Sequence, residues 1–254
     1  MFVAVDGSQF FVVSFGRGPR TLVGIGGWTG SWEVWADVFG VLSEGWRTVG
    51  IDHRGTGATL AGTEGVSFAQ MADDLLAVLD QLGIEECVLA AESSGAATAL
   101  TAVAQQPHRF SGLVLSGGLY FQPPANEPPP FLLGLQAAYE TAVDQFIRAS
   151  LPETNDPALI AWTRKILLRA DQTAAVDLYK LTLGLDLRPL LPQITLPTLL
   201  LHGDADRIVP LASSQWLASQ LAQAQLHTLP GAGHAPMITF PQAVAAAIEE
   251  FFEM

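Results

Sequence analysis

Residues 87–100 join a short apolar run to a helix of small residues through a turn that carries Ser93. The apolar run has the composition of a buried strand, and the small residues suit a helix packed closely against a sheet. Ala91 and Gly95 flank the serine at two positions on either side, so strand and helix can close around a strained turn. The stretch therefore predicts either a nucleophilic serine held on this turn or a helix N-cap serine.

Predicted strands and helices alternate along most of the chain. Two β-rich runs, 2–5 and 9–15, are separated by Asp6-Gly7-Ser8 and predict an antiparallel hairpin. Further apolar runs of strand length lie at 21–25, 47–51, 88–91, 110–115, 198–201 and 225–229. Helical patterns separate most of them, and this order predicts an α/β fold whose parallel sheet is covered on both faces.

The alternation fails between Gly117 and Pro197. A proline-rich linker at 122–130 is followed by three helical patterns without a convincing strand, at 131–150, 156–170 and 172–184. About seventy residues of this kind would have little core of their own. We therefore expect a helical cap at 118–191, inserted into one core domain made of 1–117 and 192–254.

Composition excludes several kinds of partner. The formal net charge of −13 leaves no basic stripe for a nucleic acid backbone. No apolar run reaches the roughly 18 residues of a membrane span. The first residues lack the basic region and cleavage pattern of a secretory signal, and Cys87 is the single cysteine. We expect a cytoplasmic protein in which Cys87 is a small buried hydrophobic residue.

Three loops follow the carboxyl ends of predicted parallel strands, where open α/β sheets place their ligands. One carries Ser93, the second is 202–210 and the third is 231–234. They supply Ser93, Asp206 and His234 in that order along the chain. Asp204 is a competing acid in the second loop, for which a solvated position is the simpler interpretation.

With these three loops, the chain resembles the α/β-hydrolase superfamily, in particular its esterase, haloperoxidase-like and C–C hydrolase branch with a helical cap. The resemblance covers nearly the whole chain and rests on six stretches: Gly26-Gly27-Trp28, Asp52-His-Arg-Gly-Thr-Gly57, Ala91-x-Ser93-x-Gly95, Asp186-Leu-Arg-Pro-Leu-Leu-Pro-Gln-Ile194, Leu201-x-Gly203-x-x-Asp206-x-x-x-Pro210 and Gly233-His234. It implies a mostly parallel eight-stranded sheet flanked by helices. Two departures from the family pattern are Ala91 in place of a glycine and Gly26 in place of a frequent histidine.

The resemblance implies a catalytic triad. An alcohol is a weak nucleophile, so Ser93 needs a neutral imidazole to take its proton, and His234 would do so. Asp206 would hold the imidazole and stabilise its charged form. Backbone N–H groups of Trp28 and Ser94 would form an oxyanion hole, worth about 3 kcal/mol per donor. This chemistry requires neither a cofactor nor a metal.

Three further acidic residues lie outside this triad: Glu92, Asp73 and Asp74. Glu92 precedes the nucleophile at the top of a buried strand, and we expect it to be hydrogen-bonded to a neighbouring loop or partly protonated. With Gly27 and Trp28 it is a candidate for the wall of the substrate pocket. Asp73 and Asp74 are adjacent on a predicted helix, where we expect both to be solvated.

The leading functional hypothesis is a carboxylic ester hydrolase. Its substrate would be a small to medium, fairly apolar ester or lactone, cleaved through an acyl-enzyme, since the predicted cap is rich in Leu, Phe, Tyr and Trp. Hydrolysis of a carbon–carbon bond in a diketone is the enzymatic alternative. A non-catalytic receptor that binds a small ligand on the same fold is the alternative from another class.

Overall fold

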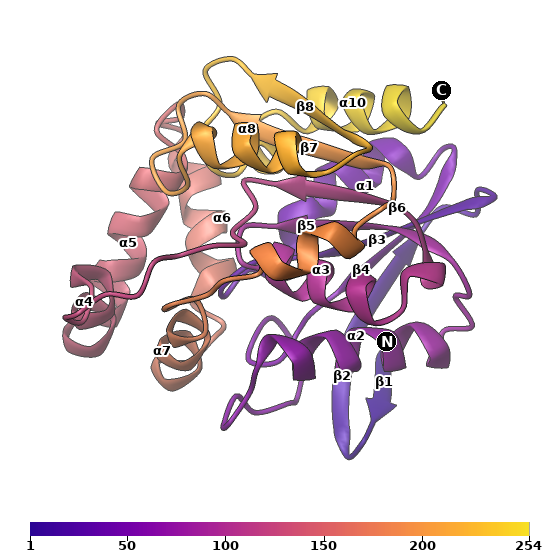
Figure 1. Ribbon diagram of the computed structural model, residues 1–254. Helices are drawn as coiled ribbons and strands as arrows, with labels where there is room; N and C mark the ends of the chain where they lie inside the picture. Colours follow the sequence, from indigo (N-terminus) through magenta and orange to yellow (C-terminus); the bar gives the residue numbers. More distant parts are fainter. Residues whose placement is uncertain (254) are drawn as a thin grey trace.

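The computed structural model describes residues 1–253, which form a twisted sheet of eight strands surrounded by helices (Figure 1). The strands are β1 (Phe2–Val5), β2 (Ser8–Phe15), β3 (Arg20–Ile25), β4 (Trp46–Ile51), β5 (Cys87–Glu92), β6 (Phe110–Ser116), β7 (Thr198–Gly203) and β8 (Ala224–Leu229). Strands β5 and β7 are buried at every residue, in agreement with their continuous apolar sequences.

The strands lie in the order β1-β2-β4-β3-β5-β6-β7-β8. Strand β2 runs antiparallel to both β1 and β4, and every pairing from β4 to β8 is parallel. The chain goes from β3 outward to β4 and then returns to place β5 on the other side of β3. The loops after β3 and β5 therefore meet at a topological switch point, where α/β sheets bind ligands. The predicted mostly parallel sheet is confirmed.

Helices cover the sheet on both faces. One apolar cluster joins the first face to α1 (Ala36–Leu42), α9 (Pro236–Thr239) and α10 (Pro241–Glu253), with the short 3-10 helix Trp32–Trp35 beside them. A second cluster joins the opposite face to α2 (Phe68–Gln81), α3 (Gly95–Gln105) and α8 (Leu211–Gln220). A 3-10 turn at Pro107–Arg109 precedes β6. Cys87 lies in the second cluster, 2% exposed, as predicted.

Four helices lie between β6 and β7, together at one end of the sheet (Figure 1). They are α4 (Pro130–Ala137), α5 (Tyr139–Ser150), α6 (Pro157–Leu167) and α7 (Gln172–Lys180), followed by a 3-10 helix at Arg188–Gln193. The predicted single helix over 131–150 is wrong, because the backbone at Ala138 leaves the helical region with φ −153° and divides it. We call α4–α7 the cap; the domain boundaries at 117 and 192 stay a prediction.

The expectation for the two adjacent acids is wrong for one of them. Asp73 is exposed, but Asp74 is 5% exposed and accepts hydrogen bonds from both Nε and Nη2 of Arg54, in the loop after β4. An α-helix turns by about 100° per residue, so neighbouring residues face different surroundings. Among residues 1–253, every helix falls short of the length and apolarity that a membrane span needs.

Candidate active site

Ser93 lies on the sharp turn between β5 and α3. Its φ of 51° is in the left-handed region, which is costly for a residue with a side chain and persists only where surrounding contacts enforce it. The Ser93 N–H donates to the Ser116 carbonyl at 2.9 Å, and the Ser93 carbonyl accepts from Leu119 N–H at 2.9 Å. The turn is thus tied to the end of β6 and to the segment that follows it.

Close packing around this turn explains its small residues. A Cβ on Gly95 would lie 2.6 Å from the Gly26 carbonyl oxygen, and one on Gly27 would lie 2.7 Å from Ser93 Cβ. Both distances are too short for a real contact, so neither position accepts a side chain without a shift. Ala91, by contrast, is fully buried with its methyl group in place. This is the physical reason that the turn tolerates Ala91 but needs Gly95.

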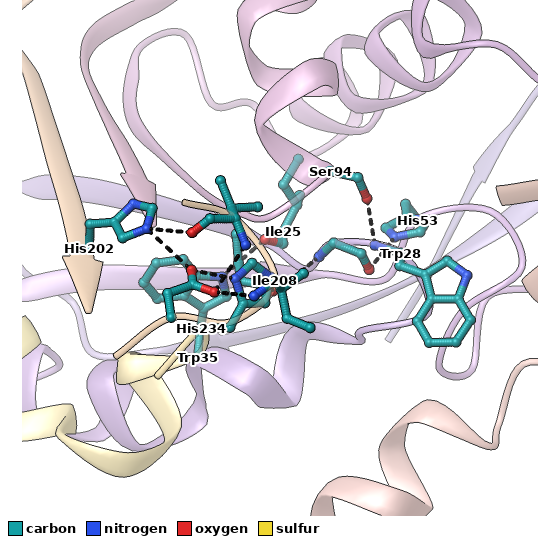
Figure 2. A network of polar contacts seen from close by, with 12 residues as sticks. Ile25, Trp28, Trp35, His53, Ser94, His202, Ile208 and His234 are labelled. Atoms are coloured by element: carbon teal, nitrogen blue, oxygen red, sulfur yellow. Dashed lines mark hydrogen bonds and ion pairs between the residues drawn. The ribbon is translucent and has the colours of Figure 1, made fainter. Parts of the chain in front are cut away.

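Asp206 and His234 meet because β7 and β8 are parallel neighbours. His234 Nδ1–H donates to Asp206 Oδ2 at 2.8 Å, while the other carboxyl oxygen accepts from the N–H groups of Ile208 and Val209 at 2.7 and 3.0 Å (Figure 2). Burial raises the pKa of Asp206, but hydrogen bonds from His202 and His234 outweigh it and hold this pKa well below its usual range. Asp206 is therefore an anion at the imidazole.

Sequence reasoning missed His202 as a partner of the acid. Its ring is fully buried, and Nε2 lies 3.0 Å from the Val209 carbonyl and 3.3 Å from Asp206 Oδ2 (Figure 2). Nδ1 lies 2.7 Å from Ser214 Oγ. The available signal was its place at the end of β7, four residues before Asp206. Asp204 is exposed and accepts from Gly231 N–H at 2.7 Å instead.

The loop after β3 lies against the turn after β5. Trp28 N–H donates to Ser94 Oγ at 2.7 Å, and Gly27 N–H donates to Glu92 Oε2 at 2.7 Å (Figure 2). The predicted oxyanion residues Trp28 and Ser94 are thus adjacent, although it is the Ser94 hydroxyl that accepts from Trp28. The expected hydrogen bond from a neighbouring loop to Glu92 is present.

Glu92 also faces the imidazole. Its Oε1 lies 3.5 Å from His234 Nε2, so His234 has one carboxyl group near each ring nitrogen. The pKa of Glu92 is raised, because the effect of burial is larger than the opposing effects of the nearby His234 and of the hydrogen bond from Gly27 N–H. Burial alone would lower the pKa of His234, but the hydrogen bond to Asp206 and the charges of Asp206 and Glu92 outweigh it and raise that pKa.

The cap contacts the loops that carry these residues. His234 N–H donates to the Ser150 carbonyl at the end of α5 at 2.7 Å, and Trp28 Nε1–H donates to the Ala175 carbonyl in α7 at 2.8 Å. Trp28 also packs edge-on against Phe146, with ring centroids 5.1 Å apart. The positions of the loop after β3 and of the imidazole thus depend on the cap.

A pocket of about 550 Å³ opens between cap and core and reaches Ser93. Its polar groups are few, among them Gln122, Gln145 and Arg207, while its apolar lining includes Trp28, Leu119, Phe131, Phe146, Tyr179 and Val209. A concave apolar wall with a few polar groups is the usual form of a small-molecule site.

Comparison with known proteins agrees with this architecture. A family model described as serine aminopeptidase, S33, matches residues 22–238. The chain belongs to the α/β-hydrolase superfamily. A sequence relative of this α/β-hydrolase is the pimeloyl-[acyl-carrier protein] methyl ester esterase of Nitrosomonas europaea, 30% identical, with 95% of this chain and 99% of that protein covered.

Solved structures confirm the fold of this α/β-hydrolase. An esterase from Exiguobacterium antarcticum superimposes with a TM-score of 0.92 at 22% identity, covering 100% of this chain and 99% of that one. An enol-lactonase from Burkholderia xenovorans LB400 gives a TM-score of 0.91 at 21% identity, with both chains covered completely. The predicted superfamily is confirmed. Relatives named as esterases support the predicted class of carboxylic ester hydrolase.

Proposed function

We propose that this protein is a serine esterase that cleaves a carboxylic ester through an acyl-enzyme on Ser93. The observation that carries the proposal is the convergence of a strained serine, a buried imidazole and an anionic aspartate on three separate loops. Ser93 and His234 line the same cavity, although no hydrogen bond joins them in the structure. Such bonds are often long before substrate binds.

In the proposed mechanism His234 Nε2 takes the Ser93 proton as Oγ attacks the substrate carbonyl carbon. Asp206 fixes the ring by accepting from Nδ1–H and stabilises the imidazolium that forms. The N–H groups of Ser94 and Trp28 donate to the developing oxyanion. To reach Trp28 N–H, the substrate oxygen displaces the Ser94 hydroxyl that now accepts from it.

The two sides of Ser93 differ in size, and this difference indicates which part of the ester lies where. The 550 Å³ pocket is lined by Ser93 and Ser94 but not by His234, whereas a cavity of about 40 Å³ is lined by both Ser93 and His234. The leaving oxygen must lie near His234 to receive its proton. We therefore assign the acyl chain to the large pocket and a small alcohol, such as methanol, to the small cavity.

The test combines active-site labelling with turnover. A fluorophosphonate should label the wild type and not Ser93→Ala, and hydrolysis of methyl hexanoate should fall at least a thousandfold in the variant. Ser219→Ala is the matched control and should behave as wild type. Ser219 is an exposed serine on α8 whose hydroxyl donates to the Trp216 carbonyl and accepts from the side chain of its exposed neighbour Gln220.

Benzyl hexanoate, with the same acyl chain, tests the assignment of the small cavity. We expect at least a tenfold lower kcat/KM for it than for methyl hexanoate. Labelling that persists in Ser93→Ala would contradict the nucleophile. Binding of a ligand with no turnover above that of Ser93→Ala would favour a receptor.

A further inference from the structure

The small cavity beside Ser93 has a polar corner. It holds about 40 Å³ and is walled mainly by apolar side chains of α5 and α6, among them Ile147, Leu151 and Ile166. Glu92, Ser150 and His234 interrupt this apolar wall. The volume is enough for about two or three water molecules, and a water needs two to four polar partners to stay in a buried site.

Two of these side chains have polar atoms left over. Within residues 1–253, His234 Nε2 and Ser150 Oγ are buried without a hydrogen-bond partner. Ser150 is only 5% exposed, and its carbonyl already holds the His234 N–H. Buried polar groups in native proteins are almost always satisfied, by protein or by ordered water. Because both residues line this cavity, the two atoms indicate a further molecule bound in it.

Glu92 supplies the acceptor. Its Oε2 accepts a hydrogen bond from Gly27 N–H, and its Oε1 lies 3.5 Å from His234 Nε2. That distance is too long for a direct hydrogen bond, so Oε1 remains available to accept from a third molecule. A carboxyl group of either charge state has an oxygen that can accept there.

We propose that this cavity holds the water that hydrolyses the acyl-enzyme, bound by Glu92 Oε1 and Ser150 Oγ beside His234 Nε2. The inference rests on the proposed acyl-enzyme. His234 Nε2 takes one proton of the water as its oxygen bonds to the acyl carbon. Glu92 Oε1 accepts a hydrogen bond from the other O–H, which stays on the water oxygen, and so aims that oxygen at the acyl carbon. The tetrahedral intermediate then collapses, its bond to Ser93 Oγ breaks, and Oγ receives the proton from His234, which releases the carboxylic acid.

The experiment measures how the acyl-enzyme divides between water and an added alcohol. Methyl hexanoate is hydrolysed in the presence of ethanol, and the ratio of ethyl hexanoate to hexanoic acid is measured. This ratio depends neither on the rate of acylation nor on the amount of folded enzyme. Glu92→Gln is isosteric and keeps an oxygen for Gly27 N–H, but it presents an N–H₂ donor where the water needs an acceptor.

We expect the ratio to rise at least tenfold in Glu92→Gln and in Ser150→Ala, because both variants weaken the hold on water. Thr101→Val is the control, since the Thr101 hydroxyl donates only to the Ala97 carbonyl within α3. A ratio within twofold of wild type in Glu92→Gln would overturn the inference while leaving the acyl-enzyme intact. A wild type that fluorophosphonate does not label would instead remove the proposed function itself.

Discussion

His234 lies between two carboxyl groups, and this placement governs how its charge responds to pH. Asp206 reaches it from the loop after β7 and Glu92 from the end of β5. Glu153, which follows α5, lies near Gly233 and accepts from Thr239 Oγ1. Burial lowers the pKa of His234, but Asp206 and Glu92 outweigh it and raise this pKa, so the imidazole stays charged to a higher pH than an ordinary histidine.

We expect kcat/KM to fall at acidic pH, and we expect Glu92 to raise the pH at which half of the activity is lost. In the proposed mechanism, activity needs the neutral imidazole and is lost as pH falls through the pKa of His234. Glu92→Gln removes one negative charge and should shift the midpoint of this fall in activity to lower pH. The pH profile of kcat/KM for methyl hexanoate measures it. An unchanged midpoint, or one moved to higher pH, would show that Glu92 carries no charge beside His234.

At the scale of elements, two loops must approach more closely than any side chain allows. A Cβ on Gly27 would lie 2.7 Å from the Glu92 carbonyl oxygen and 2.7 Å from Ser93 Cβ. The loop after β3 can therefore approach the turn after β5 this closely only because residue 27 has no side chain. The same approach brings the Gly27 N–H to Glu92 and the Trp28 N–H to Ser94.

Gly27→Ala should push the loop after β3 away from the turn after β5 and displace the proposed oxyanion donor, the Trp28 N–H. We expect kcat/KM to fall by at least a hundredfold, since loss of one such donor costs about that much. Gly40→Ala is the matched control: Gly40 is exposed in α1, and a Cβ there would meet nothing within 4 Å. It should keep full activity and gain about 0.5–1 kcal/mol in free energy of unfolding. Equal effects of the two substitutions would contradict the close-approach argument.

At the scale of the whole molecule, a largely buried ion pair ties the loop after β4 to α2. The Arg54 and Asp74 side chains are 16% and 6% exposed, and Gln70 Nε2 also donates to the Asp74 carboxylate at 3.1 Å. Removing one partner of a buried pair leaves the other charge uncompensated, which is more costly than losing an exposed pair.

We expect Asp74→Ala to lower the free energy of unfolding by about 3 kcal/mol, measured by urea denaturation. The neighbouring Asp73→Ala removes the same charge from an exposed position and should change this free energy by less than about 0.5 kcal/mol. The two variants have the same net charge, so a similar loss in both would mean that the pair with Arg54 adds no stability.

Local patterns in the sequence predicted most of the architecture. The apolar runs of strand length became β3 to β8, and the order of the elements indicated a parallel sheet. The pattern over 131–150 failed at one point, because its spacing does not show the turn at Ala138 between α4 and α5. The division of the chain at 117 and 192 follows from the same patterns and stays a prediction.

By itself, the sequence determined the fold class, because small residues, strand lengths and loop motifs are local properties. It also predicted Ser93, Asp206 and His234 as a catalytic triad, which stays a prediction. Only the tertiary structure decided three side-chain contacts. His202 lies against Asp206, buried Asp74 pairs with Arg54, and Glu92 faces His234. Two of these contacts join residues from different elements or loops, and the third joins the end of β7 to the loop that follows it. Their geometry depends on how the sheet and cap pack, which the spacing of residues along one element does not encode.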